Sequence, residues 1–138
     1  MDEMCYTFPA KLKYLRSAAK VSREVCREID ESCADKNFLR DVELCVSEAF
    51  TNALKYGQSG KTDSPISLYF QIFSNKLIIK VKDKGKGFNL ENLPELDLRS
   101  LPIHGYGLYI IRSKMDEVQY VKNIEGNFLT MTKYFKQK

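Results

Sequence analysis

The chain has 138 residues, of which 43% are hydrophobic and 29% are charged, and its formal net charge is +4. These totals are ordinary for a single globular domain, here residues 1–138, that folds without disulfide staples. No stretch approaches the ~20 consecutive apolar residues of a membrane span. The first four residues, Met1-Asp2-Glu3-Met4, include two acids and no apolar signal core. We therefore expect a cytoplasmic protein with no membrane partner.

The four cysteines raise the question of a zinc site or a disulfide framework. Cys5, Cys26, Cys33 and Cys45 form no C-x₂₋₄-C pair, which is the spacing that zinc knuckles need. The last three fall in stretches with helical periodicity, where free cysteine behaves as a small apolar residue. The spacing favours reduced thiols in the core.

Basic residues alternate along one segment, at Lys80, Lys82, Lys84 and Lys86. A nucleic-acid-binding patch is one interpretation. Solvated strand and loop positions are the other, and we favour them because the remaining basic residues are scattered. No direct nucleic-acid partner is expected, although a locally positive rim also suits an anionic nucleotide.

The first half of the chain predicts a strand and two helices. Residues 4–8 are typical of a short edge strand that Pro9 ends. Apolar or small residues then step by three and four from 12 to 33, which indicates an amphipathic helix. A second helix is predicted over 38–56, with Gly57 stopping it. Its core stripe consists of Val42, Val46, Ala49 and Ala53.

The second half alternates with a period of two and predicts strands. Residues 66–73 and 77–82 form a hairpin around a turn at 74–76, and two further strands are expected at 117–122 and 128–135. A third helix is predicted over 108–115. The order β-α-α-β-β-α-β-β indicates a two-layer α/β sandwich with a mixed, mostly antiparallel sheet and helices on one face. The long segment 84–104 between them is typical of a lid or binding loop.

Two polar residues of the second predicted helix are candidates for chemistry. Glu48 and Asn52 are four positions apart and therefore share one helix face, about a quarter turn from the core stripe. An amide oxygen can ligate Mg²⁺ and a carboxylate can accept a proton. An exposed polar pair is the alternative interpretation.

Two glycine-containing segments follow. Asp83, Gly85 and Gly87 come directly after a predicted strand, where glycines let the backbone turn and approach a ligand. Gly105 and Gly107 open the third predicted helix, whose unpaired N–H groups suit a phosphate. The pattern is neither a Rossmann fingerprint nor a Walker A loop.

In this order the three elements resemble the N box and the two glycine boxes of the GHKL superfamily, which includes gyrase, Hsp90 chaperones, histidine kinases and MutL-type proteins. Within it, the segment 46–53 (Val-Ser-Glu-Ala-Phe-Thr-Asn-Ala) is similar to the S-E-A-x-T-N-A of the bacterial anti-sigma-factor serine/threonine kinases. The resemblance covers nearly the whole chain and is strongest between residues 44 and 107.

The resemblance implies ATP and Mg²⁺ as cofactors. Glu48 is then the catalytic base that positions a partner's hydroxyl, Asn52 the Mg²⁺ ligand, and Asp83 the acceptor for the adenine amine. The further positions implied in cofactor binding are Gly85, Gly87, Gly105, Gly107, Leu108 and Asn127.

The chain departs from the family pattern at a few positions. The family commonly has His where this chain has Tyr56, and Thr often follows the last glycine, where this chain has Asn127. Arg99 is the candidate γ-phosphate contact, with Lys84 and Lys86 as substitutes. His104 is expected to be a lid residue rather than a phosphoacceptor.

The resemblance also implies partners: a sigma factor that the chain sequesters, a STAS-type anti-anti-sigma protein that it phosphorylates, and a second copy in a homodimer. A nucleotide-responsive binding module with little or no kinase activity is the alternative, and the presence of Glu48 favours the enzyme.

Overall fold

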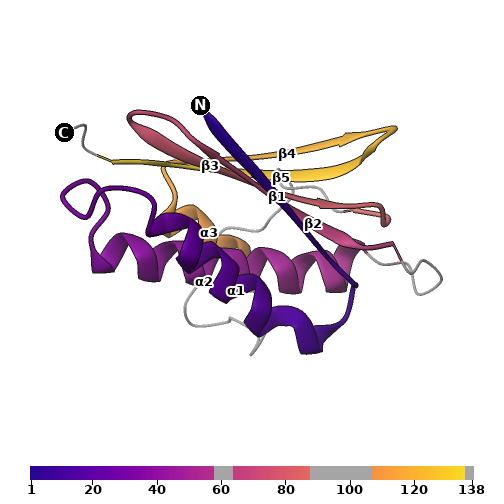
Figure 1. The fold of residues 1–138 in the computed structure, drawn as a ribbon. Coiled ribbons are helices and arrows are strands. Elements are labelled where there is room, and N and C mark those ends of the chain that lie inside the picture. Colours follow the sequence, from indigo (N-terminus) through magenta and orange to yellow (C-terminus); the bar gives the residue numbers. More distant parts are fainter. Residues whose placement is uncertain (58–63, 88–106, 136–138) are drawn as a thin grey trace, which may run out of the picture.

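The computed structural model describes residues 1–57, 64–87 and 107–135. Five strands form one sheet in the order β1-β2-β3-β5-β4, and three helices cover one face of it (Figure 1). The strands are β1 (Asp2–Phe8), β2 (Ile66–Ile72), β3 (Lys76–Asp83), β4 (Glu117–Asn123) and β5 (Gly126–Tyr134). The helices are α1 (Leu15–Cys26), α2 (Lys36–Asn52) and α3 (Gly107–Lys114), with a short 3-10 helix (Leu12–Tyr14) before α1 and a π-helix (Ala53–Gly57) after α2. The predicted element order and two-layer architecture are confirmed.

The sheet follows the alternation that the sequence predicts. Ile66, Leu68 and Phe70 of β2 are fully buried against the helices, while the residues between them face the open side. β1 pairs only with β2 and is an edge strand, as expected. The prediction allowed for a mixed sheet, whereas all four strand pairs in the described part of the chain are antiparallel.

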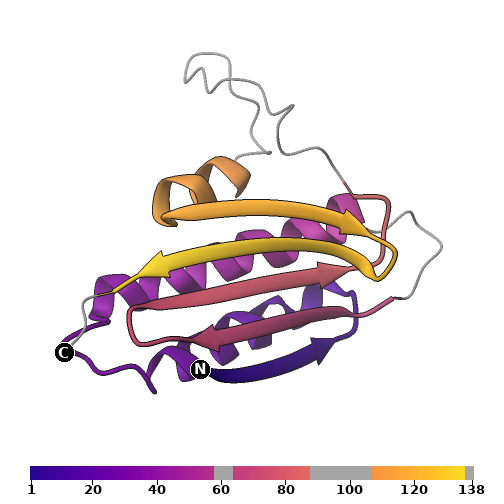
Figure 2. The same cartoon turned by 90° about the horizontal axis from the view of Figure 1, so that it is seen from above.

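Helix α2 is the central helix of the covering layer, with α1 on one side and α3 on the other (Figure 2). Asp35 caps its N-terminus, because the Asp35 side chain accepts a hydrogen bond from the Phe38 N–H at 3.0 Å. The predicted stripe of Val42, Val46 and Ala49 is buried against the sheet. The regular helix ends at Asn52 rather than at residue 56, and the π-helix continues from there.

Helix α1 is shorter than the predicted span of 12–33. Leu12 is 64% exposed and lies before the helix, which ends at Cys26. Asp30 then organises a turn, since its carboxylate accepts from the Ser32 N–H at 2.9 Å and its carbonyl accepts from the Cys33 N–H at 2.8 Å. Ile29 lies in this turn, and its side chain is buried. Its position in the sequence therefore fits the spacing of a helix although the residue is not helical.

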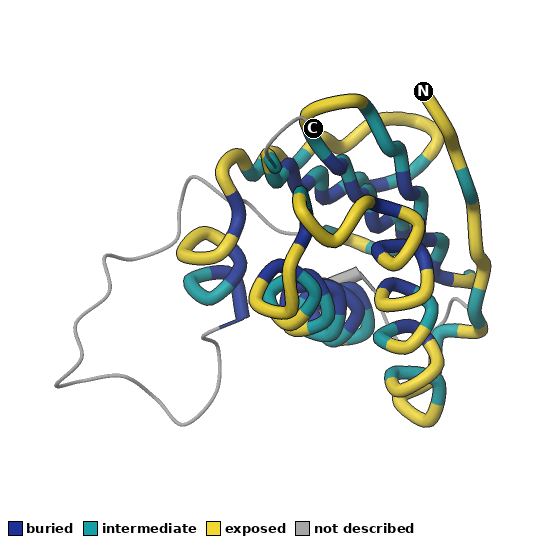
Figure 3. The backbone as a smooth tube through the Cα atoms, turned by 60° about the vertical axis from the view of Figure 1, so that its left-hand side comes forward, coloured by how far each residue is buried: buried dark blue, intermediate teal, exposed yellow. Residues whose placement is uncertain are grey.

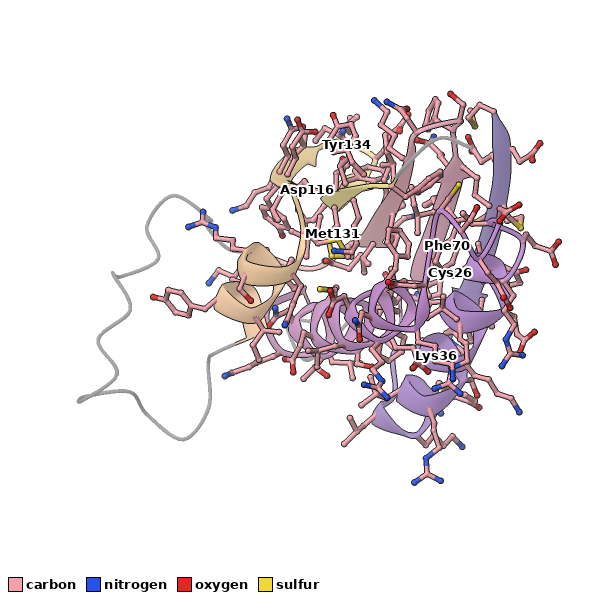
Figure 4. All side chains as sticks on the ribbon, turned by 90° about the vertical axis from the view of Figure 1, so that its left-hand side faces the viewer. Cys26, Lys36, Phe70, Asp116, Met131 and Tyr134 are labelled. Carbon is pink, nitrogen blue, oxygen red and sulfur yellow. The ribbon has the colours of Figure 1, made fainter. Side chains whose placement is uncertain are left out.

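The core lies between the sheet and the helices. Buried positions of α2 and of the sheet face each other across it (Figure 3). Phe50 of α2 is fully buried and meets Phe8 of β1 edge to face, with ring centroids 6.1 Å apart. Phe70, Met131 and Cys26 reach the same layer from β2, β5 and α1 (Figure 4).

Helix α3 is held at its C-terminal end by an ionic cluster. The Lys133 ammonium on β5 donates to the Lys114 carbonyl at 2.7 Å and lies 3.5 Å from an Asp41 carboxylate oxygen on α2. Because a cation at a helix C-terminus also complements the helix dipole, this cluster fixes α3 against both α2 and the sheet. The other end of α3 is thereby directed toward the C-terminal half of α2.

The cysteines divide into two environments. Cys26 and Cys45 are fully buried, Cys33 is half-buried and Cys5 is exposed on β1, so the expectation of core thiols holds for two of the four. Burial raises the pKa of both Cys26 and Cys45 from 9.0 to about 12, and nearby carboxylates act in the same direction. The buried thiols are therefore protonated at neutral pH.

We expect a thiol reagent at pH 8 to modify Cys5 in the folded protein while Cys26 and Cys45 react only after unfolding, because a protonated buried thiol is a poor nucleophile.

The same two buried thiols make stability depend on pH. Their pKa is higher in the folded than in the unfolded state, so their contribution to stability is complete below pH 9 and is lost as pH rises from 9 toward 12. Mass spectrometry of alkylated protein, with and without denaturant, and thermal melts at increasing pH test both points. Equal native labelling of Cys5 and Cys26 would contradict the assignment.

Candidate functional site

Glu48 and Asn52 lie on the same face of α2, one turn apart, as predicted. Asn52 is only 8% exposed, and its Nδ2 has no hydrogen-bond partner among the described residues. Glu48 is half-buried. A buried amide without a partner costs about 1–3 kcal/mol, so the arrangement favours a ligand at this position.

The N-terminus of α3 approaches this pair closely. A Cβ placed on Gly107, the first residue of α3, would lie 2.7 Å from Glu48 Oε2 and 3.2 Å from Asn52 Nδ2. Only glycine allows that approach without displacing the carboxylate. A carboxylate and an amide therefore lie beside the positive end of a helix dipole, and helix N-termini bind phosphate groups.

A second polar pair lies at the end of β3 and the start of β5. Asp83 and Asn127 face each other in the antiparallel register and are 4% and 5% exposed. Asn127 Nδ2 donates to Asp83 Oδ1 at 2.9 Å and to the Gly85 carbonyl at 2.8 Å. The Gly85 N–H donates to the same Asp83 oxygen at 2.9 Å. The buried carboxylate is thus held by two donors on one oxygen.

Gly87 closes the turn after β3 and lies beside this pair. Its φ of +78° belongs to the left-handed region, and a Cβ on it would lie 2.8 Å from Tyr120 Oη and 3.2 Å from Asn127 Oδ1. Lys122 also borders this position, with its Cε 2.9 Å from the same Cβ. Tyr120 and Lys122 were not candidates from the sequence, because only the β4–β5 register places them beside residue 87.

The two polar pairs belong to the same end of the domain. The π-helix that begins directly after Asn52 contacts β3, the strand that ends in Asp83. π-helical turns inside helical segments are frequent at functional sites. The structure therefore brings the N-box residues and the first glycine box of the sequence interpretation to neighbouring positions.

Some predicted positions are placed differently or are not described. Leu108 is 4% exposed and packs in the core, so its backbone N–H is the group that it can offer to a ligand. Gly105, Arg99, His104 and the side chain of Tyr56 lie outside the described residues, as does most of the predicted lid, 88–104. Lys84 and Lys86, the proposed substitutes for Arg99, are exposed after β3.

The donor set fits a magnesium nucleotide. No group of three or more His, Cys, Asp or Glu side chains within 1–57, 64–87 and 107–135 is arranged to hold a metal ion. Mg²⁺ in nucleotide sites usually has one or two protein ligands, with phosphate and water supplying the rest. The single amide of Asn52 beside a helix N-terminus is compatible with that mode, and the buried Asp83 carboxylate can accept a hydrogen bond from a ligand amine.

A scan against family models matches residues 8–133 to the histidine kinase-like ATPase domain. Among curated proteins, a serine-protein kinase RsbW of Listeria innocua is 33% identical over 108 residues, covering 72% of this chain and 68% of the relative. The serine-protein kinase RsbW of Oceanobacillus iheyensis is 29% identical over 134 residues, covering 91% and 82%.

Solved structures show the same fold. The RsbU and RsbW domains of Rv1364c from Mycobacterium tuberculosis align with a TM-score of 0.69 at 17% identity, covering 99% of this chain and 33% of that one. The catalytic domain of the histidine kinase ThkA aligns with a TM-score of 0.57 at 13% identity, covering 98% and 99%. The expected GHKL resemblance is confirmed, and the chain belongs to the histidine kinase-like ATPase family, in which it is related to the serine-protein kinases RsbW.

Proposed function

We propose that this chain is an ATP-dependent protein serine/threonine kinase that sequesters a sigma factor and phosphorylates a STAS-type anti-anti-sigma protein. The observation that carries the proposal is the meeting of Glu48, the partnerless amide of Asn52 and the N-terminus of α3 at Gly107. Nucleotide binding alone does not require a carboxylate at the phosphate end. A kinase does, because a hydroxyl must be oriented and deprotonated there.

Each residue has a role that its surroundings support. Asp83 accepts a hydrogen bond from the exocyclic amine of adenine, and the backbone around Gly85 and Gly87 forms the pocket wall. Asn52 ligates Mg²⁺ through its amide oxygen, and the α3 N–H groups bind phosphate oxygens. Bound Mg²⁺ neutralises the charge that develops on the phosphates during transfer. Gly105 and Leu108 complete the proposed nucleotide contacts, and Asn127 belongs to the same site through its hydrogen bond to Asp83.

Glu48 is proposed as the base. It accepts the proton of the attacking serine or threonine hydroxyl, whose oxygen forms the new bond to the γ-phosphorus as the bond to the β–γ bridging oxygen breaks. ADP is the leaving group. The Glu48 carboxylate lies close to Gly107 at the N-terminus of α3, where the phosphate chain is proposed to end. Catalysis then consists mainly of positioning and charge stabilisation.

A protein substrate needs a docking surface, and one groove lies on the side of α2 that faces α1. It lies between α1 and α2, has a volume of about 520 Å³ and includes Ser47, the residue before Glu48. Leu12, 64% exposed, and Leu15 line it together with Arg16. Four basic residues and no acidic one occur between residues 11 and 20, and none of them forms an ion pair with a described residue. The groove therefore suits a partner with acidic and apolar side chains.

Further parts of the proposal rest on the relationship to RsbW. They are a single regulatory domain over 1–138, a homodimer, a role in transcription regulation and a cytoplasmic location. None of the described helices is long and apolar enough to cross a membrane.

The alternating lysines noted in the sequence include Lys80 and Lys82, which lie on the open face of the sheet, away from the groove.

The first prediction separates nucleotide binding from transfer. Glu48→Gln keeps the size of the side chain but removes the base, so phosphoryl transfer to a STAS-type protein should fall by roughly 10²–10⁴ while ATP affinity changes only a few-fold. Asn52→Ala removes the metal ligand, so affinity for Mg·ATP and transfer should fall together. Calorimetry and transfer of labelled phosphate measure the two quantities.

Glu43→Gln is the matched control, because Glu43 lies on the same helix in a surface ion pair with Arg23 at 2.7 Å. It should leave binding and transfer near wild type. A Glu48→Gln protein that phosphorylates its partner at the wild-type rate would instead support the nucleotide-responsive binding module.

The second prediction concerns the groove between α1 and α2. Arg16→Glu reverses one charge at its rim, so transfer to the protein partner should slow at least ~10-fold at low salt through weaker association. ATP affinity should not change. Lys36→Glu makes the same charge change at the start of α2 and serves as the control. Equal effects of the two variants on partner binding would refute a docking role for the groove.

A further inference from the structure

The buried pair of Asp83 and Asn127 has a hydrogen-bond pattern that leaves no donor to spare. An amide Nδ2 carries two hydrogens. Asn127 gives one to Asp83 Oδ1 at 2.9 Å and the other to the Gly85 carbonyl at 2.8 Å. The carboxamide oxygen faces Gly87, 3.2 Å from the position of a Cβ there. Both amide hydrogens of Asn127 are therefore used without any contact to a ligand.

The hydrogen bonds of Asp83 are divided unequally between its two carboxylate oxygens. Its Oδ1 accepts two hydrogen bonds, from the Gly85 N–H at 2.9 Å and from Asn127 Nδ2 at 2.9 Å. No described residue donates to Oδ2. Because a backbone N–H and a side chain of the neighbouring strand both bind Oδ1, the carboxylate cannot rotate freely and Oδ2 remains as an acceptor. Asp83 is 4% exposed, and this oxygen is the one that can accept a hydrogen bond from a ligand.

The alternative assignments of this amide are less favourable. If the Asn127 amide were reversed, its oxygen would face both the Asp83 carboxylate and the Gly85 carbonyl, which are acceptors only. The network thus fixes which atom is nitrogen. A side chain at this position that contacted the ligand directly would have to release one of these two bonds inside a buried site.

We propose that Asn127 is a positioning residue that holds Asp83 as a pure hydrogen-bond acceptor and thereby makes the site selective for a base with an exocyclic amine over one with an oxo group at the same position. This inference rests on the proposed nucleotide site. A 6-aminopurine donates to Asp83 Oδ2. A 6-oxopurine places a carbonyl oxygen against a buried carboxylate, and no amide hydrogen of Asn127 is left to satisfy it. Sites of this kind reject the mismatched analogue strongly because buried polar groups are left unpaired.

The test compares ATP with ITP, which carries an oxo group in place of the amine, by calorimetry on the full chain. Asn127→Ala removes one of the two donors that fix Asp83, so the ratio of ATP to ITP affinity should fall at least ~10-fold. Asn127→Thr retains a hydroxyl donor and should restore most of the ratio. Gln119→Ala, on the exposed face of β4, is the control and should leave the ratio unchanged.

An isosteric variant guards against the effect of simple misfolding. Asp83→Asn keeps an oxygen for the Gly85 N–H and for Asn127 Nδ2 but places an amide nitrogen at the ligand side. Thermal melts should show a folded protein, and the ATP preference should be lost because the amide at position 83 can donate to an oxo group. A folded Asp83→Asn variant with the wild-type ATP to ITP ratio overturns the inference.

The outcomes separate this inference from the function on which it rests. A wild-type chain that binds neither nucleotide refutes the proposed nucleotide site itself. A wild-type chain that prefers ATP, together with an unchanged ratio in Asn127→Ala, refutes only the positioning role of Asn127 and leaves the site in place.

Discussion

The packing of α2 against the sheet is the constraint on which the other features depend. One face of this helix buries Val42, Val46 and Ala49 in the core. Burial of a side chain as large as valine contributes about 1.5–3 kcal/mol to the stability of the fold. The adjoining face carries Glu48 and Asn52. Rotation of α2 about its axis would withdraw the apolar stripe from the core, so the same burial that stabilises the fold fixes the direction of the two polar side chains.

Helix α3 depends on α2 in turn. Asp41 near the start of α2 holds Lys133, which binds the last carbonyl of α3, and this fixes one end of the helix. The other end then approaches Glu48 so closely that a Cβ at position 107 would displace the carboxylate. The ionic cluster is partly exposed, with the Asp41 side chain at 27%, so its net contribution to stability is small. Its consequence is geometric, because it joins the C-terminal end of α3 to both α2 and β5.

The sequence predicted the elements well and the contacts between them poorly. The alternation of Ile66, Leu68 and Phe70 and the stripe of α2 are periodic signals set by burial, and both appear in the structure. The end of α1 was wrong because Ile29 is buried from a turn and mimics the next helical position. The partnership of Asp83 and Asn127 spans 44 residues and depends on the β3–β5 register, which no local pattern encodes.

The two polar pairs of the site illustrate opposite solutions to burial. Asp83 Oδ1 is held by two donors in the absence of a ligand, one of them from Asn127, so this carboxylate is preorganised and would lose little entropy on binding. Asn52 is buried with an amide hydrogen-bond donor that no described residue satisfies, a cost of about 1–3 kcal/mol that a ligand can relieve. The phosphate end is therefore the part of the site that is less stable without ligand. Asn52 and the groove that includes Ser47 both belong to α2. The proposed nucleotide site and the proposed docking groove thus share α2 as a common structural element.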